Sequence, residues 1–234
     1  LKKTVLELGG SDPYIVLEDA DLEATVETCV AARLVNSGQS CIAAKRFIVV
    51  ERIRPSFEEA FIEIMRQQVM GAPSDRGATL GPLARQDLRD ALHRQVQESV
   101  QRGARLCLGG EIPNLPGWFY PPTVLTNVCP GMPIFDEETF GPVAAIVPAR
   151  DEQEAIVLAN ASMYGLGAAV FTQDRDRGEY IARNLLHAGS CFVNAYVRSD
   201  PRLPFGGIKH SGWGRELSVF GIREFVNIKT VCIA

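Results

Sequence analysis

Short runs of β-branched residues alternate with longer amphipathic segments along this chain, and this alternation limits the fold more than any other feature. The run "RFIVVERI" (46–53) has the composition of a strand. The segment "PSFEEAFIEIMRQQV" (55–69) begins with a proline and repeats apolar residues every three or four positions, as a helix does. The same alternation returns in "GPVAAIVPA" (141–149) and "DEQEAIVLANAS" (151–162). Strands separated by helices of this length are typical of βαβ units, so the sequence predicts an α/β fold with a mostly parallel sheet.

Three further expectations concern the ends of elements and the connections between them. Residues 19–38 are predicted to form a helix that Asp19 or Asp21 caps and that Gly38 ends. Residues 111–142 are rich in Pro and Gly and are expected to form long loops. The segment "EFVNIKTVCIA" (224–234) has the pattern of a lone strand, which leaves an unpaired edge unless it finds a sheet.

Charge and composition argue against several classes of function. The net charge is −4, and no run of Lys or Arg marks a phosphate-binding surface, so a nucleic-acid partner is not expected. No window approaches the ~18 apolar residues of a membrane span. The opening residues "LKKTVLELGG" lack the apolar core of a signal peptide, so we expect a cytoplasmic protein. The three histidines lie near no cysteine or carboxylate at ligand spacing, so no metal is expected.

Cys41 stands apart from the other five cysteines, which are read as reduced thiols because no C-x-x-C pair or disulfide framework is present. It follows the glycine-containing turn "NSGQS" and precedes the small-residue run "IAA". A short helix starting at Cys41 would lower the pKa of its thiol and make it a nucleophile. The alternative is a small buried hydrophobe, the commonest role of a free cysteine.

Glu7 is a carboxylate within the apolar strand pattern "TVLELGG" (4–10). Burial of a charged group is costly, so such a glutamate is usually paired or functional, and its pKa tends to rise. A buried structural salt bridge is the alternative interpretation.

Two other segments carry polar groups at glycine turns. "EETFGP" (137–142) offers a carboxylate for ligand hydroxyls such as those of a ribose, or a cap in a solvated loop. "PFGGIKHSGWGRE" (204–216) is rich in glycine, but it does not match the P-loop pattern. No G-x-G-x-x-G follows a strand, so the chain contains no self-sufficient dinucleotide-binding fingerprint.

Four of these segments, taken in order, resemble the aldehyde dehydrogenase superfamily: "LELGG" (6–10), "NSGQSC" (36–41), "EETFGP" and "PFGGIKHSGWGRE". The resemblance covers nearly the whole chain and is strongest to the succinate-semialdehyde dehydrogenases, particularly over 199–225. It implies a three-layer α/β fold, in which an open, mostly parallel twisted sheet carries helices on both faces. It also implies oxidation of an aldehyde, with succinate semialdehyde as the expected substrate, by NAD or NADP.

The resemblance assigns roles residue by residue. Cys41 matches the nucleophile of the family's G-Q-x-C motif, and Glu7 matches the general base that activates the deacylating water. Glu138 matches the carboxylate that holds the nicotinamide ribose, and Phe140 matches an aromatic residue near the nicotinamide. Leu8 and Gly9 would lie beside the nicotinamide, and Phe205 would line the aldehyde pocket.

The distal carboxylate of a semialdehyde requires cations or hydroxyls. Many related enzymes carry an arginine six positions before the nucleophile, but here that position is Val35. The alternative carboxylate partners are three residues just ahead of Phe205: Arg198, Ser199 and Arg202. A solvated loop is an equally open interpretation of these three.

Family members carry a Rossmann-type cofactor domain before the region that this chain resembles. By that comparison, residues 1–9 end the last strand and linker of the cofactor domain, and residues 10–210 form the catalytic domain. Residues 211–225 return towards the cofactor domain, and residues 226–234 form an oligomerisation strand. We therefore expect a fragment that binds NAD(P) weakly, has no dehydrogenase turnover alone, requires its own cofactor domain as a partner, and belongs to a homo-oligomer.

Two functions of other classes stay open from the sequence. One is an ester or thioester hydrolase that uses Cys41 and Glu7 without NAD. The other is a non-enzymatic assembly fragment joined through its terminal strand.

Overall fold

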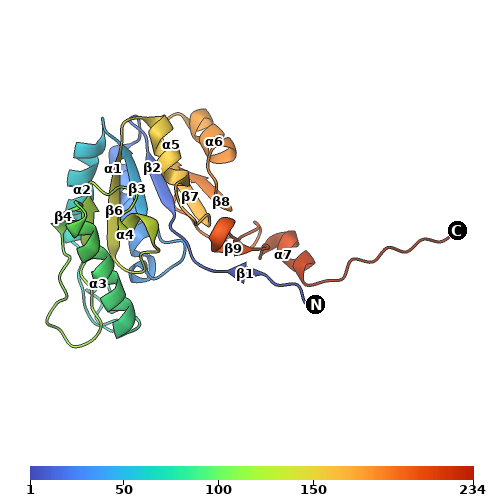
Figure 1. The fold of residues 1–234 in the computed structure, drawn as a ribbon, viewed down its shortest axis with the longest axis horizontal. Helices are drawn as coiled ribbons and strands as arrows, with labels where there is room; N and C mark the ends of the chain where they lie inside the picture. The colour runs from blue at the N-terminus through green and yellow to red at the C-terminus, as the bar shows by residue number, and fades with distance from the viewer.

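A seven-stranded sheet forms the centre of the protein, and the computed structural model describes residues 1–234 (Figure 1). The strand order is β4-β5-β6-β3-β2-β7-β8. Every neighbouring pair is parallel except β4 with β5. The strands are β2 (Pro13–Val16), β3 (Arg46–Val50), β4 (Arg105–Leu108), β5 (Thr123–Thr126), β6 (Val143–Ala149), β7 (Gly167–Phe171) and β8 (Ser190–Val193).

Helices cover both faces of this sheet, as expected. One face carries α1 (Leu22–Leu34) and α2 (Arg54–Arg66), and the other carries α3 (Gln86–Gln101), α4 (Pro133–Asp136), α5 (Glu152–Asn160) and α6 (Arg175–Asn184). Alternate residues of each strand enter the two cores. Tyr14 packs on the α1–α2 side, whereas its neighbour Ile15 packs on the opposite side. The predicted three-layer α/β architecture is therefore confirmed.

Aromatic packing fixes α2 against the sheet. Phe57 and Phe61 of α2 stack with ring centroids 5.4 Å apart, and Phe61 lies 4.9 Å from Phe47 of β3. All three side chains are fully buried. Burial of each such side chain contributes roughly 2–3 kcal/mol, so this cluster is a major source of stability for that layer.

The first helix ends earlier than the sequence predicts. Asp21 is the N-cap, as one of the two expected candidates, and its carboxylate accepts from the Ala24 amide. The α-helix stops at Leu34, and a short 3-10 turn, η1 (Val35–Gly38), follows. Asn36 and Ser37 have φ values of 50° and 56°, which lie outside the right-handed helical region, so Gly38 ends the turn rather than the α-helix.

Other differences concern short elements. Residues 111–142 are not only loops, because they include β5 and the single-turn helix α4. The expectation of loops alone was wrong because the apolar runs of β5 and α4 are short and Pro and Gly residues flank them, so the composition of the whole segment resembles that of a loop. The interior strand β2 was also not predicted, since it is only four residues long.

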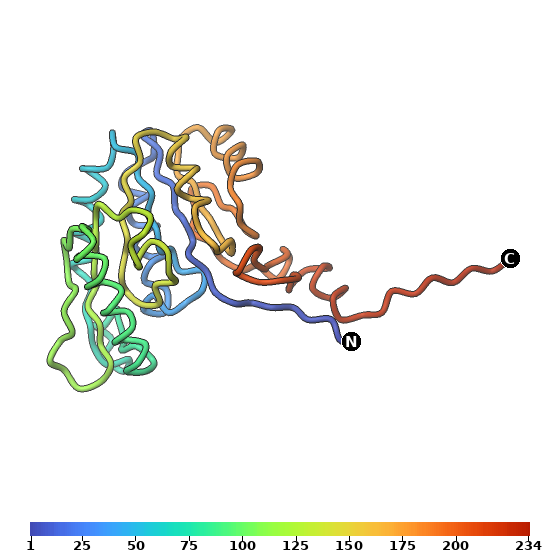
Figure 2. Tube along the Cα trace, in the orientation of Figure 1, coloured from blue at the N-terminus to red at the C-terminus, as the bar shows by residue number.

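The first residues of the chain lie beside residues 211–225 in an arm next to the main body, and the C-terminal residues extend away from it (Figures 1 and 2). Strand β1 (Leu6–Glu7) pairs antiparallel with β9 (Gly212–Trp213), which follows the 3-10 turn η2 (Lys209–Ser211), and Lys3 pairs with Glu224 at 2.8 Å. Helix α7 (Ser218–Glu224) occupies the start of the predicted terminal strand. The last ten residues form no strand, because no sheet edge in this chain reaches them.

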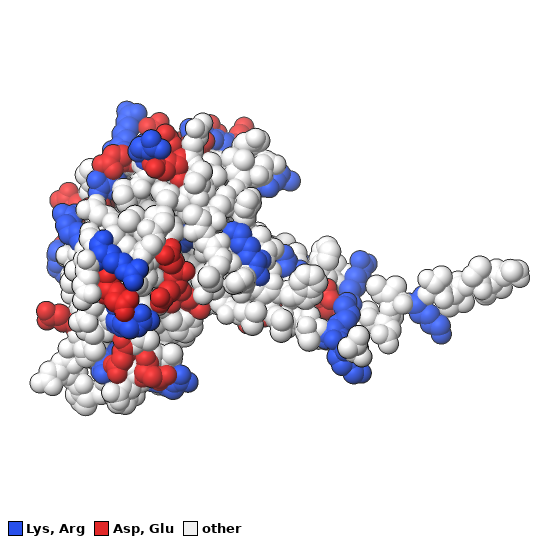
Figure 3. Space-filling view, viewed as in Figure 1, with Lys and Arg blue, Asp and Glu red and all other residues white.

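Charged and apolar surface are unevenly distributed. Lys, Arg, Asp and Glu are interspersed over the main body, whereas uncharged side chains dominate the arm (Figure 3). The exposed apolar residues of α7 and the terminal segment are Val219, Phe220, Ile222, Phe225, Val226, Ile228, Val231 and Ile233. None of the helices combines the length and the apolar character needed to cross a membrane.

Candidate active site

The predicted site segments meet at the amino edge of the parallel strands. Residues 10–12 lead into β2, residues 40–45 lead into β3, and residues 137–142 lead into β6. Strands β6, β3 and β2 are consecutive neighbours in the sheet, so these three connections are brought together although 128 positions separate Gly10 from Glu138. The sheet order is thus the reason that distant motifs form one site.

Cys41 lies in a tight turn between η1 and β3. The Ala43 amide donates to the Ser40 carbonyl at 3.1 Å and closes the turn. The preceding Gly38, with a φ of 77°, approaches the loop before β6 so closely that a Cβ would lie 2.2 Å from the Gly141 oxygen. The glycine of the motif is therefore required by a backbone contact, not by the end of a helix.

No helix starts at Cys41, and the expected lowering of its pKa is wrong. Burial raises the pKa of the Cys41 thiol above its usual value. The Lys45 ammonium acts in the opposite direction, the negative charges of Asp12 and Glu7 raise this pKa further, and the Ile42 amide lowers it by donating to the sulfur. The turn lacks the aligned dipoles that a helix would supply, so burial prevails.

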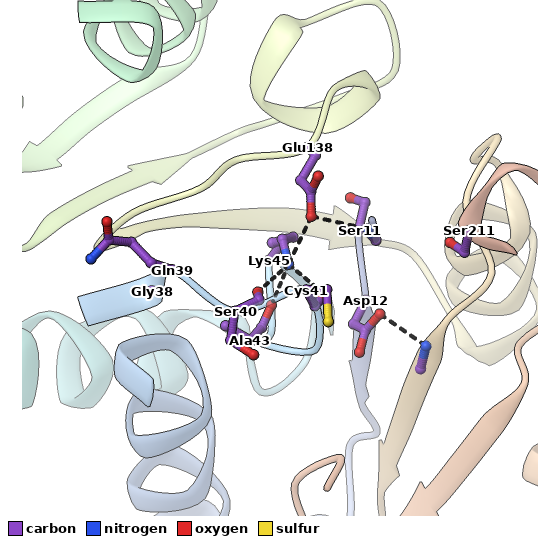
Figure 4. Close-up of polar contacts among 12 residues, drawn as sticks. Ser11, Asp12, Gly38, Gln39, Ser40, Cys41, Ala43, Lys45, Glu138 and Ser211 are labelled. Carbon is purple, nitrogen blue, oxygen red and sulfur yellow. Dashed lines mark hydrogen bonds and ion pairs between the residues drawn. The ribbon is translucent and has the colours of Figure 1, made fainter. Parts of the chain in front are cut away.

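Glu138 is half-buried beside Cys41. Its Oε1 accepts a 3.0 Å hydrogen bond from the Gly10 amide and lies 3.9 Å from the Lys45 ammonium (Figure 4). Gly9 has a φ of 133°, and a Cβ there would lie 2.6 Å from Glu138 Oε2. The absence of a side chain at Gly9 keeps that oxygen open, and no protein group donates to it, so an acceptor is available for ligand hydroxyls. The loop is not solvated, since Thr139 next to Glu138 is fully buried.

Glu7 is exposed on β1 and forms no salt bridge, which contradicts the buried-pair interpretation. Partial desolvation raises its pKa, the nearby Glu216 carboxylate raises it further, and Arg215 and the Gly207 amide lower it. The expected rise is confirmed. Its charge also influences Cys41, so the two predicted catalytic groups lie on the same side of the site.

The remaining predicted residues are less closely gathered. Phe140 is half-buried, Leu8 is exposed, and Phe205 is 8% exposed and pairs through its backbone with Glu216. Three predicted carboxylate partners occupy an exposed loop: Arg198, Ser199 and Arg202.

Contacts within that loop occupy both arginines. The Arg202 guanidinium is held by Asp200 at 2.6 Å, and Arg198 lies over the Tyr196 ring at 5.8 Å. Their placement fits the solvated-loop interpretation.

No set of three or more His, Cys, Asp or Glu side chains is arranged to hold a metal ion.

Sequence reasoning missed the buried charges beneath the site. Asp12, Lys45 and Arg46 are at most 1% exposed, and Arg33 is fully buried. Arg33 donates to the carbonyl oxygens of Gly38 and Val143, so it clamps the nucleophile loop and is not available to a substrate carboxylate. The positions of Asp12 and Lys45 in the sequence could have indicated these buried charges. Asp12 stands directly before an apolar strand, and Lys45 stands one residue before an apolar run, where an exposed charge is not expected.

The aldehyde dehydrogenase family model matches residues 1–231. The chain belongs to the aldehyde dehydrogenase family. Its similarity to the succinate semialdehyde dehydrogenase [NAD(P)+] Sad of Escherichia coli is 54% identity over 231 residues, which cover 99% of the chain and 50% of that protein. It is 49% identical over 234 residues to the succinate-semialdehyde dehydrogenase [NADP(+)] of Mycobacterium leprae, covering 100% of the chain and 51% of that protein.

A solved structure shares the fold closely. The structure of Gox0499 superposes with a TM-score of 0.96 at 45% identity, covering 100% of this chain and 51% of that one. The chain therefore spans about half the length of the aldehyde dehydrogenase relatives that it matches.

Proposed function

We propose that this chain is the catalytic part of an NAD(P)-dependent aldehyde dehydrogenase that oxidises an aldehyde through a thioester on Cys41. The observation that carries the proposal is the meeting of Cys41, the Gly9–Gly10 turn and Glu138 at one edge of the sheet. Family membership supports the reaction class, since the relatives named above are dehydrogenases that use NADP or either cofactor.

The first chemical step is attack of the Cys41 thiolate on the aldehyde carbon. The carbonyl oxygen then acquires negative charge, which requires hydrogen-bond donors directed at it. The amide of Cys41 is one candidate donor. A covalent intermediate divides a difficult oxidation into two easier steps, and cysteine suits this role because its thiolate is intrinsically nucleophilic.

Glu7 is the proposed base for the second half of the reaction. Its raised pKa favours acceptance of a proton from water, and that water then hydrolyses the thioester. The position of Glu7 at the junction between the arm and the main body gives it access to both solvent and the Cys41 turn.

Glu138 is the proposed contact to the cofactor ribose. Its open Oε2 and the bare backbone of Gly9 form a cradle that fits a pair of hydroxyls, with Phe140 and Leu8 as neighbouring contacts. When bound, the nicotinamide supplies the hydride acceptor. The chain's own contribution is to orient the ribose and to hold it near Cys41.

The arrangement of the arm supports the domain boundaries that we propose. Residues 1–9 and 211–225 are joined by the β1–β9 ladder, apart from the main sheet that residues 10–210 build. We propose that this arm contacts the chain's own cofactor domain, and that residues 226–234 serve in a homo-oligomer. Their exposed apolar side chains suit such contacts.

Two measurements test this function. In the longer protein that carries this chain, Cys41→Ser should abolish NAD(P)H formation from an aldehyde, and retained turnover would refute the role of Cys41. Calorimetric titration of the isolated chain should show no micromolar binding of NAD or NADP. Micromolar affinity would contradict the proposal that the cofactor domain is required.

Succinate semialdehyde is the proposed substrate, supported by the names of the relatives. Arg198, Ser199 and Arg202 remain the proposed partners of its distal carboxylate, and binding there would replace the present contacts of the two arginines with Tyr196 and Asp200. Replacement of each arginine by alanine in the longer protein should raise KM for succinate semialdehyde and leave KM for an uncharged aldehyde of similar length unchanged. Unchanged kcat/KM for the semialdehyde in both variants would remove these two residues from the site.

A further inference from the structure

The buried ammonium of Lys45 has all of its donors directed at a single turn. It donates to the carbonyl oxygens of Ser40 at 3.0 Å, Cys41 at 2.7 Å and Ala43 at 3.0 Å. A lysine ammonium has three N–H donors, so no donor remains for another partner. Figure 4 shows these three contacts together with the approach to Glu138, whose Oε1 lies 3.9 Å away.

These contacts determine which way the peptide planes of the turn face. In a trans peptide, the carbonyl of one residue and the amide N–H of the next point in opposite directions. Because Lys45 draws the Ser40 and Cys41 carbonyls to one side, the amides of Cys41 and Ile42 are turned to the other. This orientation leaves the Ile42 amide on the side of the Cys41 sulfur, where it lowers the pKa of the thiol.

We propose that Lys45 is a positioning residue whose buried ammonium orients the amides of the Cys41 turn towards the thiol and supplies the positive charge that favours its thiolate. The inference rests on the proposed function, in which Cys41 is the nucleophile. Lys45 does not touch the substrate; it acts through the backbone and the charge of the Cys41 turn.

The charges around Cys41 show why a cation is needed there. Asp12, at the start of β2, and Glu7, on β1, both disfavour a thiolate, and Lys45 is the largest opposing influence. Burial lowers the pKa of Lys45 to about 8, with the Arg33 charge acting in the same direction, while Asp12, Glu138 and Cys41 raise it. Lys45 therefore stays mostly protonated at pH 7, where the thiolate must form.

A purely structural role for Lys45 is the competing explanation, since its charge also offsets the buried Asp12 carboxylate. The two roles differ in their effect on the Cys41 titration. Loss of the Lys45 charge disfavours the thiolate, whereas loss of the Asp12 charge favours it. If each substitution only destabilised the core, the pH profile of Cys41 alkylation would shift in the same direction in both variants.

The test is the pH dependence of Cys41 alkylation in the full chain. Iodoacetamide labelling of Cys41 is followed by mass spectrometry between pH 6 and 10 in wild type, Lys45→Gln, Asp12→Asn and the double variant. The double variant removes both buried charges together, so it keeps the core neutral if the single Lys45 variant fails to fold. Lys209→Gln is the matched control, because Lys209 also donates to two backbone carbonyls, those of Asn160 and Ser162, at 3.1 Å each.

Lys45→Gln should slow Cys41 alkylation at pH 7 by roughly tenfold, because loss of the nearby positive charge lowers the thiolate fraction of a mostly protonated thiol. Asp12→Asn should accelerate it, the double variant should fall between Lys45→Gln and wild type, and Lys209→Gln should match wild type. An unshifted profile in both Lys45→Gln and the double variant would overturn the inference, as would shifts of the same sign in Lys45→Gln and Asp12→Asn. These outcomes leave the proposed function standing, because the loss of turnover in Cys41→Ser tests that function separately.

Discussion

The Gly10 amide donates a 3.0 Å hydrogen bond to Glu138 Oε1 and so joins the connection before β2 to the connection before β6. The strand between them, β3, is preceded by the Cys41 turn. The Cys41 turn, which holds the proposed nucleophile, therefore lies between two connections that are joined by this hydrogen bond. These connections approach each other closely at Gly9 and Gly38, where a side chain would collide with the neighbouring connection. Replacement of such a glycine therefore tests how rigid the connections are.

Gly38→Ala should destabilise the chain more than Gly131→Ala. Both residues have a positive φ, of 77° and 92°, so both variants incur backbone strain of about 1–3 kcal/mol. A Cβ at Gly38 would also lie 2.2 Å from the Gly141 oxygen, whereas nothing lies within 4 Å of a Cβ at Gly131. Urea unfolding should show an additional loss of about 1–3 kcal/mol for Gly38→Ala. Equal losses would mean that the loop before β6 moves away freely.

The buried Asp12 should make stability fall as the pH rises from about 4 to 6. Burial raises its pKa from 3.8 to about 6, so in this range the folded chain holds a proton that the unfolded chain has released. The stability from this group is fully present below 3.8 and is lost by about pH 6, a change of about 3 kcal/mol.

Asp12→Asn provides the comparison that isolates this effect. The difference in unfolding free energy between wild type and Asp12→Asn should change with pH over the same window, and it should become flat above about pH 7. A difference that is constant from pH 4 to 7 would show that Asp12 titrates normally.

Cys41 of the isolated chain should behave as a weakly acidic thiol. Because burial raises its pKa, the rate of alkylation should increase about tenfold for each pH unit from 7 to 8 and should not reach a plateau there. The exposed Cys129 and Cys232 are internal controls, because their alkylation in the same sample shows that the reagent is active. A plateau below pH 8 would contradict the predicted direction.

Removal of residues 226–234 should leave the unfolding free energy unchanged within ~0.5 kcal/mol, because these residues form no strand and lie away from the main sheet. The same truncation should reduce self-association measured by sedimentation, since it removes the exposed side chains of Val231 and Ile233. A loss of more than 1 kcal/mol would show that the segment packs on the body in solution.

The layer architecture was predictable because local patterns determine it. Alternation of β-branched runs with amphipathic segments predicts parallel βαβ units, and Asp21, Asp151 and Asp174 cap their helices through the side chain. The resemblance assigned roles to Cys41, Glu7 and Glu138, and the structure brings the Cys41 turn and the Glu138 loop to one edge of the sheet.

The immediate surroundings of the nucleophile were not predictable. The pKa of Cys41 depends on Lys45 and also on Asp12, which precedes another strand, so the sequence around Cys41 does not contain the whole effect. Helix formation after Cys41 was expected from small residues alone, but Lys45 holds the carbonyls of that segment in a turn. A contact across the sheet contributes to the first outcome, and a buried lysine four positions after Cys41 decides the second.

The amino edge of the sheet also has a definite electrostatic polarity. Helices α1 and α5 run back to this edge, so the partially negative ends of their dipoles point at the site. Arg33 occupies the last turn of α1, and Arg46 donates to the carbonyls of Leu158 and Ala159 at the end of α5. Such an edge attracts cations and offers no helix N-terminus to a phosphate. A dinucleotide held at Glu138 would therefore meet this edge with its ribose hydroxyls and direct its pyrophosphate away from it.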